Sequence, residues 1–409
     1  MSKLAICNVG PIKNGLGRDE YISFDGLTVI TGIQGSGKST IAKVYSSLCW
    51  LEKSLVREDV SLDEANNVEF FLDDVMSFQG ISEYFSDKSF VHFIGSKYEF
   101  KLDKNIFSIS ERDNPAYSSP KIMYVPAERN FLTSIVRPEL ISKLPRALHA
   151  FLAEYEEAKD YIRSKLVDLP IGKLKYQYEP DDGSSYLVGE GFKTNLINGS
   201  SGYQSLVPLF LVTEYLSDFI SNQNMNGTDE HLNVALQRRI TKEFQKAFSS
   251  LEHVKNRKVK DFILTINQIR KRFTYSAFIN VVEEPEQNLY PDSQKSILFE
   301  LLKALNKSKD NRLVITTHSP YIVSFLTLNF MANRLFEKEL SDTNFKQVSD
   351  IVPRASTISP SIANVYECNG GGSIEKLDIA EGFIPDDNKL NYKFEEINEQ
   401  FSSLLYMEE

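Results

Sequence analysis

The sequence has few cysteines and no long apolar run. Among 409 residues only Cys7, Cys49 and Cys368 carry thiols, an odd number without metal-ligand spacing. This pattern argues against a disulfide framework and favours a reducing compartment, so we expect three small buried side chains. No stretch approaches the roughly 20 apolar residues that cross a bilayer, and no basic segment precedes an apolar one at the N-terminus. We therefore expect neither a membrane anchor nor an export signal, and a cytoplasmic location.

The chain also lacks an excess of positive charge. Lys plus Arg number 46 and Asp plus Glu 56, which gives a formal net charge of −10 at pH 7. Phosphate backbones are bound mainly by Lys and Arg, so this balance argues against a protein that binds nucleic acid over its whole surface. The composition, 42% hydrophobic and 25% charged, is globular. At about 150 residues per domain, the length suggests two or three core-forming units.

Short apolar runs alternate with longer helical segments, which indicates an α/β fold. Strands are expected at residues 4–8, 21–24, 27–31, 122–125, 278–282, 313–316 and 365–368. Helices are expected at residues 39–51, 138–166, 292–305 and 394–406, and from Ser201 beyond Tyr215. Between residues 68 and 102, apolar residues recur at every second position in short runs, which predicts an antiparallel subsheet.

The middle of the chain holds a hairpin, a loop and a basic cluster. The hairpin turns at residues 180–183, and we expect its two strands to bring together Leu174, Tyr176, Tyr178, Tyr186 and Val188, the first three facing the last two. Residues 222–229 are polar and rich in Gly and Asn, so a flexible loop is expected, with helical periodicity following it through residue 247. The basic cluster, most often a solvated helix face but able to contact nucleic acid or an acidic partner, comprises Lys255, Arg257, Lys258, Lys260, Arg270, Lys271 and Arg272.

The most specific motif follows the strand at 27–31. The run Gly32-Ile33-Gln34-Gly35-Ser36-Gly37-Lys38-Ser39 matches the phosphate-binding pattern G-x-x-x-x-G-K-[ST] between a strand and a helix. Its glycines let backbone N–H groups turn toward a phosphate, and the helix adds its positive N-terminal end. Lys38 would bridge the β- and γ-phosphates, and the Ser39 hydroxyl would bind Mg²⁺. We expect ATP to be held by Gly32, Gln34, Gly35, Ser36, Gly37, Lys38, Ser39 and Thr40.

Two further strands end in polar residues that suit nucleotide hydrolysis. The strand at 278–282 delivers Glu283 to the Mg²⁺ shell, while Glu284 would activate the attacking water. The strand at 313–316 is followed by His318, which can contact a γ-phosphate. A lone histidine is more often a satisfied core residue, and an acidic pair after a strand can be a solvated turn. The phosphate loop earlier in the chain favours the functional interpretation of both.

A small-residue turn precedes the helix at Ser201. Ser201 and Gly202 could present a hydroxyl and N–H groups to an anion, although a simple helix cap is the ordinary interpretation of such a turn. Farther upstream, Glu128 and Arg129 follow a short strand, and we expect them to form a structural ion pair in preference to contacting nucleotide.

In order and form these motifs resemble the ABC-type ATPase heads of the branch that includes Rad50, SMC and overcoming-lysogenization-defect (OLD) proteins. The run Glu283-Glu284-Pro285-Glu286-x-x-Leu289-x-Pro291 is similar to the Walker B form of OLD-like and antiphage ATPases. Ser201-Gly202-Tyr203-Gln204 resembles the signature motif, and His318 the switch histidine. The resemblance, which covers about residues 1–330, implies a P-loop core sheet with an antiparallel β subdomain and a helical signature lobe.

The resemblance also implies how the chain would work. Ser201 and Gly202 would meet ATP held by a second protomer, so ATP-sandwich dimers and a homo-oligomer are expected. The compact form is similar to the ATPase subunits of bacterial antiphage systems of the PARIS and Septu types, which implies a separately encoded effector, a nuclease, and leaves open a phage-encoded trigger. We expect three lobes at residues 1–130, 131–275 and 276–409, carrying the phosphate loop, the signature turn with the basic insert, and the Walker B and switch residues.

Some features depart from that pattern. About 160 residues separate the phosphate loop from Ser201, too few for a long coiled coil, and Gln79 is only a weak candidate for the glutamine that such ATPases place beside the nucleotide. The 91 residues after His318 hold no acidic pair on a recognisable strand, since Asp386 and Asp387 sit in a polar turn, so a nuclease in the same chain is not expected. The alternative function is a DNA-repair ATPase of the SMC, Rad50 or RecF kind that binds DNA directly. A transporter subunit is disfavoured.

Overall fold

The computed structural model describes residues 2–114, 117, 119–135, 143–163, 165–226, 274–379, 384 and 396–404. The basic cluster, Asp386 and Asp387 lie outside these residues, as does the helical periodicity expected up to residue 247. The three cysteines are free and buried, as expected. In the described part of the chain, no helix combines the length and apolar character that crossing a bilayer requires.

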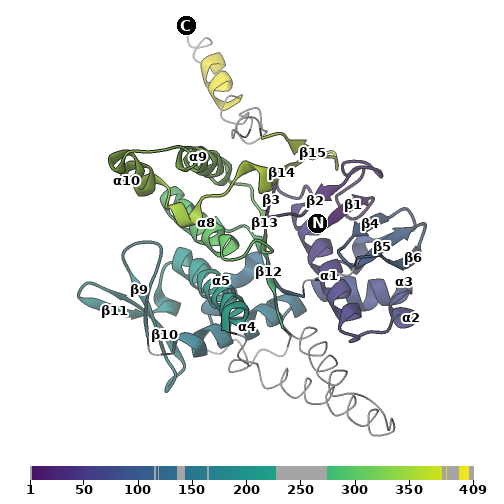
Figure 1. The fold of residues 1–409 in the computed structure, drawn as a ribbon, viewed down its shortest axis with the longest axis horizontal. Helices are drawn as coiled ribbons and strands as arrows, with labels where there is room; N and C mark the ends of the chain where they lie inside the picture. The colour runs from purple at the N-terminus through teal and green to yellow at the C-terminus, as the bar shows by residue number, and fades with distance from the viewer. Residues whose placement is uncertain are drawn as a thin grey trace.

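The centre of the fold is a six-stranded sheet in which five neighbouring strands run parallel (Figure 1). Only the edge strand β15 is antiparallel, to β14. All parallel strands end at the same edge of a sheet, so the residues after several of these strands are brought together. Across the sheet the order is β15 (Ile374–Leu377), β14 (Ala363–Cys368), β3 (Leu27–Gly32), β13 (Arg312–Thr316), β12 (Ala277–Glu283) and β7 (Pro120–Val125).

Both faces of this sheet are buried, in two separate cores. Along β12, Val282 belongs to one core and Val281 to the other, because successive side chains point to opposite faces. Helix α1 (Lys38–Val56) covers the face toward Val281, together with the antiparallel sheet. The opposite face packs against helices whose bounds are α4 (Arg146–Ile162), α5 (Ser201–Asn226), α8 (Pro291–Asn306) and α9 (Pro320–Phe336). The α/β fold with a P-loop core sheet and an antiparallel subdomain is therefore confirmed.

The antiparallel subdomain begins later in the chain than its sequence pattern indicates. Its strands are β2 (Ile22–Ser23), β1 (Lys3–Cys7), β4 (Phe90–Ile94), β5 (Tyr98–Asp103) and β6 (Ile106–Glu111). The prediction of strands from residue 68 is wrong up to Tyr84, because that stretch forms short helical turns. The Asn67 side chain accepts a hydrogen bond from the Glu69 N–H and starts the first turn, and Phe71 and Val75, four residues apart, both enter the core. These helical segments are α2 (Leu62–Ala65), α3 (Val68–Phe70), η1 (Phe71–Met76), η2 (Ser77–Gln79) and η3 (Ser82–Tyr84).

The helical lobe carries a small four-stranded sheet that contains the predicted hairpin. Its order is β11 (Phe192–Asn195), β10 (Ser184–Gly189), β9 (Lys175–Glu179) and β8 (Leu166–Asp168). The predicted partners are wrong by one position: Tyr176 pairs with Leu187 and Tyr178 with Ser185, so Tyr186 and Val188 lie on the opposite face. The four-residue loop 180–183 fixes this register, because Glu179 pairs with Ser184 across it.

The other elements agree broadly with their predicted positions. The helix predicted at 138–166 is shorter, since α4 ends at Ile162 and β8 begins at Leu166. Helix α5 continues to Asn226, so residues 222–226 of the expected flexible loop are helical. Residues 396–404 form the expected C-terminal helix. The remaining segments include η4 (Ala127–Thr133), η6 (Leu196–Asn198), α10 (Asp342–Ile351), η7 (Arg354–Ser356) and η8 (Pro360–Ile362).

A matched pair of isoleucines in the antiparallel subdomain tests the assigned core. Ile6 is 1% exposed on β1, whereas Ile106 is 69% exposed on β6 of the same sheet. Ile6→Ala should lower the free energy of unfolding by about 2–5 kcal/mol, because it removes buried methylenes and leaves a cavity. Ile106→Ala should change it by less than about 0.5 kcal/mol. Chemical denaturation of both variants provides the measurement, and equal losses would contradict the assigned register.

Candidate active site

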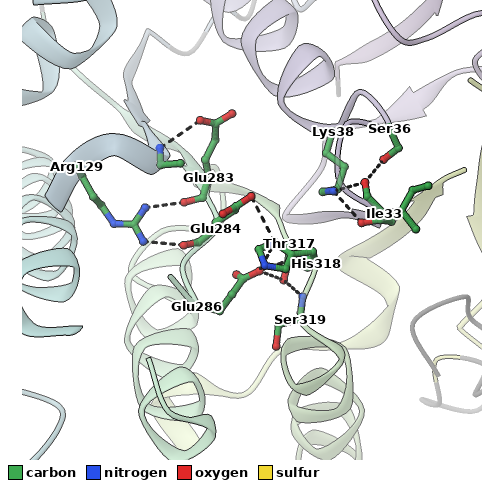
Figure 2. A network of polar contacts seen from close by, with 12 residues as sticks. Ile33, Ser36, Lys38, Arg129, Glu283, Glu284, Glu286, Thr317, His318 and Ser319 are labelled. Atoms are coloured by element: carbon green, nitrogen blue, oxygen red, sulfur yellow. Dashed lines mark hydrogen bonds and ion pairs between the residues drawn. The ribbon is translucent and has the colours of Figure 1, made fainter. Parts of the chain in front are cut away.

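The phosphate-binding loop joins β3 to α1 and closes around Lys38. Gly32 has a positive φ of 133°, and a Cβ there would lie 2.1 Å from the Cys368 carbonyl oxygen, so this position requires glycine. Lys38 is 6% exposed, and its Nζ donates to the carbonyl oxygens of Gly32 and Ile33, at 2.8 Å each (Figure 2). Burial lowers the pKa of Lys38. The ammonium group is thus held inside the loop, next to the N-terminus of α1.

The predicted nucleotide-binding residues divide into buried and exposed groups. Ser36 is buried, with its hydroxyl donating to the Ile33 carbonyl oxygen at 2.7 Å, and Thr40 is also buried. Gln34, Gly35 and Ser39 are exposed. The exposed positions follow one another along the outside of the loop and at the first turn of α1, where a phosphate and its cation would approach.

Two consecutive carboxylates at the end of β12 point in different directions (Figure 2). Glu283 is 4% exposed, and its Oε2 accepts a hydrogen bond from the Ala127 N–H at 3.3 Å. Glu284 has a left-handed φ of 43°, and its N–H donates to the Thr316 carbonyl oxygen at 2.9 Å. The change from extended to left-handed backbone turns the Glu284 side chain toward His318 and away from the pocket that Glu283 enters.

His318 connects the carboxylates to the end of β13. Its Nδ1 lies 3.4 Å from Glu284 Oε1 and 3.5 Å from Glu286 Oε1. Glu286 is 5% exposed, and its Oε1 also accepts hydrogen bonds from the Thr317 hydroxyl and the His318 N–H, at 2.7 and 2.9 Å. The contact with Glu284 raises the pKa of His318, and the contact with His318 lowers the pKa of Glu284. The pair therefore favours an imidazolium beside a carboxylate.

A pocket of about 250 Å³ lies beside Glu283, and its lining shows whether the residues around Glu283 suit Mg²⁺. Three of its lining residues each carry a buried oxygen without a hydrogen-bond partner among the described residues: Glu283 Oε1, Tyr124 Oη and Gln79 Oε1. Burial and the neighbouring Glu283 raise the pKa of Tyr124. In the described residues no three His, Cys, Asp or Glu side chains could hold a metal by themselves. Mg²⁺ commonly keeps several waters and binds one or two protein oxygens plus substrate phosphates, so these oxygen donors fit that ion.

The signature turn lies at a different place from these residues. Ser201 is exposed at the first position of α5. Gly202 is buried, and a Cβ there would lie 2.9 Å from the Asn288 carbonyl oxygen. The turn therefore packs on the segment that follows Glu286, and the Ser201 hydroxyl remains accessible to another molecule.

Arg129 has a role in the site that the sequence did not reveal. The predicted ion pair with Glu128 is not formed: Glu128 is exposed, whereas Arg129 is 1% exposed and donates to backbone carbonyl oxygens, including those of Glu283 and Glu284. Burial lowers the pKa of Arg129 to about 10. In the sequence, the short strand before Pro126 and the resemblance of residues 124–130 to a segment of such ATPases mark the position of Arg129, but neither indicates its partners.

A family model described as an AAA ATPase domain matches residues 262–323, a range that includes β12, β13 and His318. No curated protein matches the sequence. The structure is similar to the SMC head domain from Thermotoga maritima, with a TM-score of 0.36 and 12% identity over 92% of this chain and 98% of that chain. It is also similar to an SMC head bound to the C-winged helix domain of ScpA (TM-score 0.33, 13% identity, 79% of this chain and 90% of that one). A further similar structure is the recombination mediator RecF (TM-score 0.29, 11% identity, 92% and 97%).

The contact between His318 and Glu284 predicts a measurable titration. The pKa of His318 should lie above its ordinary value of 6.5, and Glu284→Gln should lower it, because the neutral amide no longer stabilises the imidazolium. NMR titration of the ring protons measures this value. Glu128→Gln, an exposed carboxylate substituted in the same way, is the control and should leave the titration unchanged. An unaltered midpoint in Glu284→Gln would show that the pair is not formed in solution.

Proposed function

We propose that the protein binds ATP and hydrolyses it to ADP and phosphate with the help of Mg²⁺. The observation that carries this proposal is the register of three neighbouring strands. Glu283 on β12 pairs with Thr316 on β13, which pairs with Ile30 on β3, so the carboxylates and His318 lie at the same edge as the phosphate loop. A phosphate loop, two carboxylates and an imidazole at one edge are the groups that nucleotide hydrolysis requires.

Each residue has a chemical role in this proposal. Lys38 and the N–H groups of the loop bind the phosphates, and Ser39 and Glu283 are the groups that would hold Mg²⁺. Bound there, the ion would neutralise charge on the phosphate oxygens. Glu284 is ionised at neutral pH, since its pKa is lowered, and it orients the attacking water and accepts its proton. Protonated His318 stabilises the negative charge that develops on the γ-phosphate.

The exposed signature turn supports self-association. Gly202 packs against Asn288, whereas Ser201, the first residue of α5, is exposed and open to a second protomer. We infer that Ser201 and Gly202 complete the ATP site of a second protomer, as in an ATP sandwich. ATP then belongs to both protomers, so nucleotide binding joins them and hydrolysis releases them.

The biological role we propose is that of an ATPase subunit in a bacterial antiphage complex in the cytoplasm. It would regulate a separately encoded effector, a nuclease, in response to a phage-encoded trigger. One support is the Glu283–Pro291 run, which resembles the Walker B form of antiphage ATPases. The other is the short segment between the phosphate loop and Ser201, which forms the antiparallel subdomain, α4 and the four-stranded sheet and leaves no room for a long coiled coil. DNA-stimulated ATPase activity with strong salt dependence would favour the alternative, a DNA-repair ATPase.

Glu284→Gln should separate ATP binding from hydrolysis. The amide keeps the shape of the carboxylate but cannot accept a proton, so turnover should fall by at least about 100-fold while ATP still binds. Mass photometry with ATP and Mg²⁺ should then show that the variant stays in the ATP-bound oligomer. Adding the protein encoded by the neighbouring gene should increase the mass of this oligomer further. Wild-type turnover would exclude Glu284 as the base. If the mass changes neither with ATP nor with the neighbouring protein, the result contradicts both ATP-dependent assembly and the binding of a separately encoded effector.

Mixing two inactive variants tests whether the sites are shared. Lys38→Ala removes the phosphate-binding cation, and Ser201→Arg blocks the signature turn, so each variant alone should lack activity. In a mixed dimer one site combines the intact Lys38 of one protomer with the intact Ser201 of the other. Turnover should therefore recover to about a quarter to a half of the wild-type value in an equimolar mixture. Failure to recover any activity counts against a composite site.

A further inference from the structure

The segment η4 lies between the end of β12, which Arg129 contacts as Figure 2 shows, and the start of α5, which it contacts at Ser205. Its Nη1 and Nη2 donate to the carbonyl oxygens of Glu283 and Glu284, each at 2.7 Å. Its Nε donates to the Ser205 carbonyl oxygen on α5 at 3.1 Å. One buried guanidinium therefore bonds to the backbone of both proposed catalytic carboxylates and to the helix that begins at Ser201.

Pro208 inside α5 creates a further acceptor for η4, one residue before Ser205. Proline has no N–H, so the carbonyl oxygen of Gln204, four residues earlier, receives no helical hydrogen bond, and the proline ring pushes that carbonyl away from the axis. The Thr133 hydroxyl at the end of η4 occupies this position, 2.9 Å from the Gln204 oxygen and equally far from the Asn130 oxygen. The proline thus creates an acceptor on α5, and η4 supplies the donor.

Other contacts tie the same three segments together. The Ala127 N–H at the start of η4 donates to Glu283 Oε2 at 3.3 Å. The Asn288 amide, in the turn after β12, donates to the Ser205 hydroxyl at 3.1 Å. Hydrogen bonds from a buried charged donor to carbonyl oxygens are stronger than neutral ones, and removing the donor leaves buried acceptors unsatisfied. The end of β12, η4 and the first turn of α5 are therefore held as one unit.

We propose that Arg129, assisted by Thr133, is a positioning residue that couples the two ATP sites in which each protomer takes part. This inference rests on the proposed ATP sandwich, in which Glu284 serves the protomer's own nucleotide and Ser201 serves its partner's. Arg129 fixes the backbone at Glu284 relative to the Ser201 turn, so a displacement at one site moves the residue that serves the other. Arg129 itself touches no nucleotide and acts through the two segments it holds.

A double-mutant cycle tests the link to α5 without any assay of ATP hydrolysis. Thr133→Val keeps the side-chain shape and removes the hydroxyl, and should lower the melting temperature by about 2 °C or more. Pro208→Ala restores an N–H that can bond to the Gln204 oxygen. In the Pro208→Ala background, Thr133→Val should therefore cost half as much or less. The same loss in both backgrounds would overturn the link.

Steady-state kinetics test the link to Glu284. Arg129→Lys keeps a buried cation, but its single nitrogen atom cannot reach the three carbonyl oxygens that Nε, Nη1 and Nη2 of Arg129 reach from separate positions. We therefore expect kcat to fall about 10-fold or more while KM for ATP changes less than about 3-fold. Glu190→Gln, an exposed carboxylate in the turn between β10 and β11, is the control and should leave both constants unchanged. Melting curves identify a variant that fails to fold, in which case the Thr133 cycle decides the proposal. An unchanged kcat in folded Arg129→Lys contradicts it.

Mixtures of variants then ask whether Arg129 serves one site or both. In a mixture with Lys38→Ala, Arg129→Lys contributes its own nucleotide site; in a mixture with Ser201→Arg, it contributes its signature turn. We expect both mixtures to remain below half the activity of the Lys38→Ala and Ser201→Arg mixture. Recovery to that level in either one shows that Arg129 serves a single site and overturns the coupling. If the reference mixture is itself inactive, the ATP sandwich fails, and the Thr133 cycle still reports on the link to α5.

Discussion

The parallel pairing of β14, β3, β13, β12 and β7 is the constraint on which the rest of the structure depends. Both faces of these strands are covered, so their interiors are apolar and polar groups gather where the strands end. Parallel strands share one such edge. The phosphate loop, the two carboxylates and His318 are far apart in sequence, and the sheet alone brings them together. A substitution that shifted the register of β13 would therefore displace His318 from both the carboxylates and the phosphate loop.

Backbone conformation at Glu284 divides the work of two adjacent carboxylates. In a regular strand, two consecutive side chains such as those of Glu283 and Glu284 would point to opposite faces of the sheet. The left-handed φ at Glu284 instead places its side chain at the end of the strand, beside His318. Glu284 contributes to stability above its ordinary pKa of 4.5, and this contribution is lost as the pH falls through its lowered pKa. The contribution of His318 is present below 6.5 and is lost as the pH rises through its raised pKa. Both contributions are therefore present together between pH 4.5 and 6.5.

The sequence predicted what depends on local pattern and missed what depends on tertiary contacts. The phosphate loop, the strands at 278–282 and 313–316 and the helix from Ser201 follow from apolar runs and turn residues. The stretch 68–84 was misassigned because short apolar runs suit either a strand or a helical turn until burial selects one. The hairpin register depends on the length of its loop, residues 180–183. A shift of the strand pairing by one residue moves every side chain of the strand to the other face of the sheet. Nothing in the sequence shows that Arg129 bonds to carbonyl oxygens 154 and 155 residues away.

The contact of Thr133 also explains why a proline is tolerated inside α5. In a helix interior, proline costs about 3 kcal/mol, mainly through a lost hydrogen bond and a displaced carbonyl. Here Thr133 bonds to the displaced Gln204 carbonyl and Arg129 to its neighbour on Ser205, so the irregularity becomes a point of attachment. A regular helix would offer η4 no unbonded carbonyl at Gln204. The Thr133 bond that the proline makes available adds to the bonds of Arg129, and together they join the signature turn to the catalytic edge of the sheet.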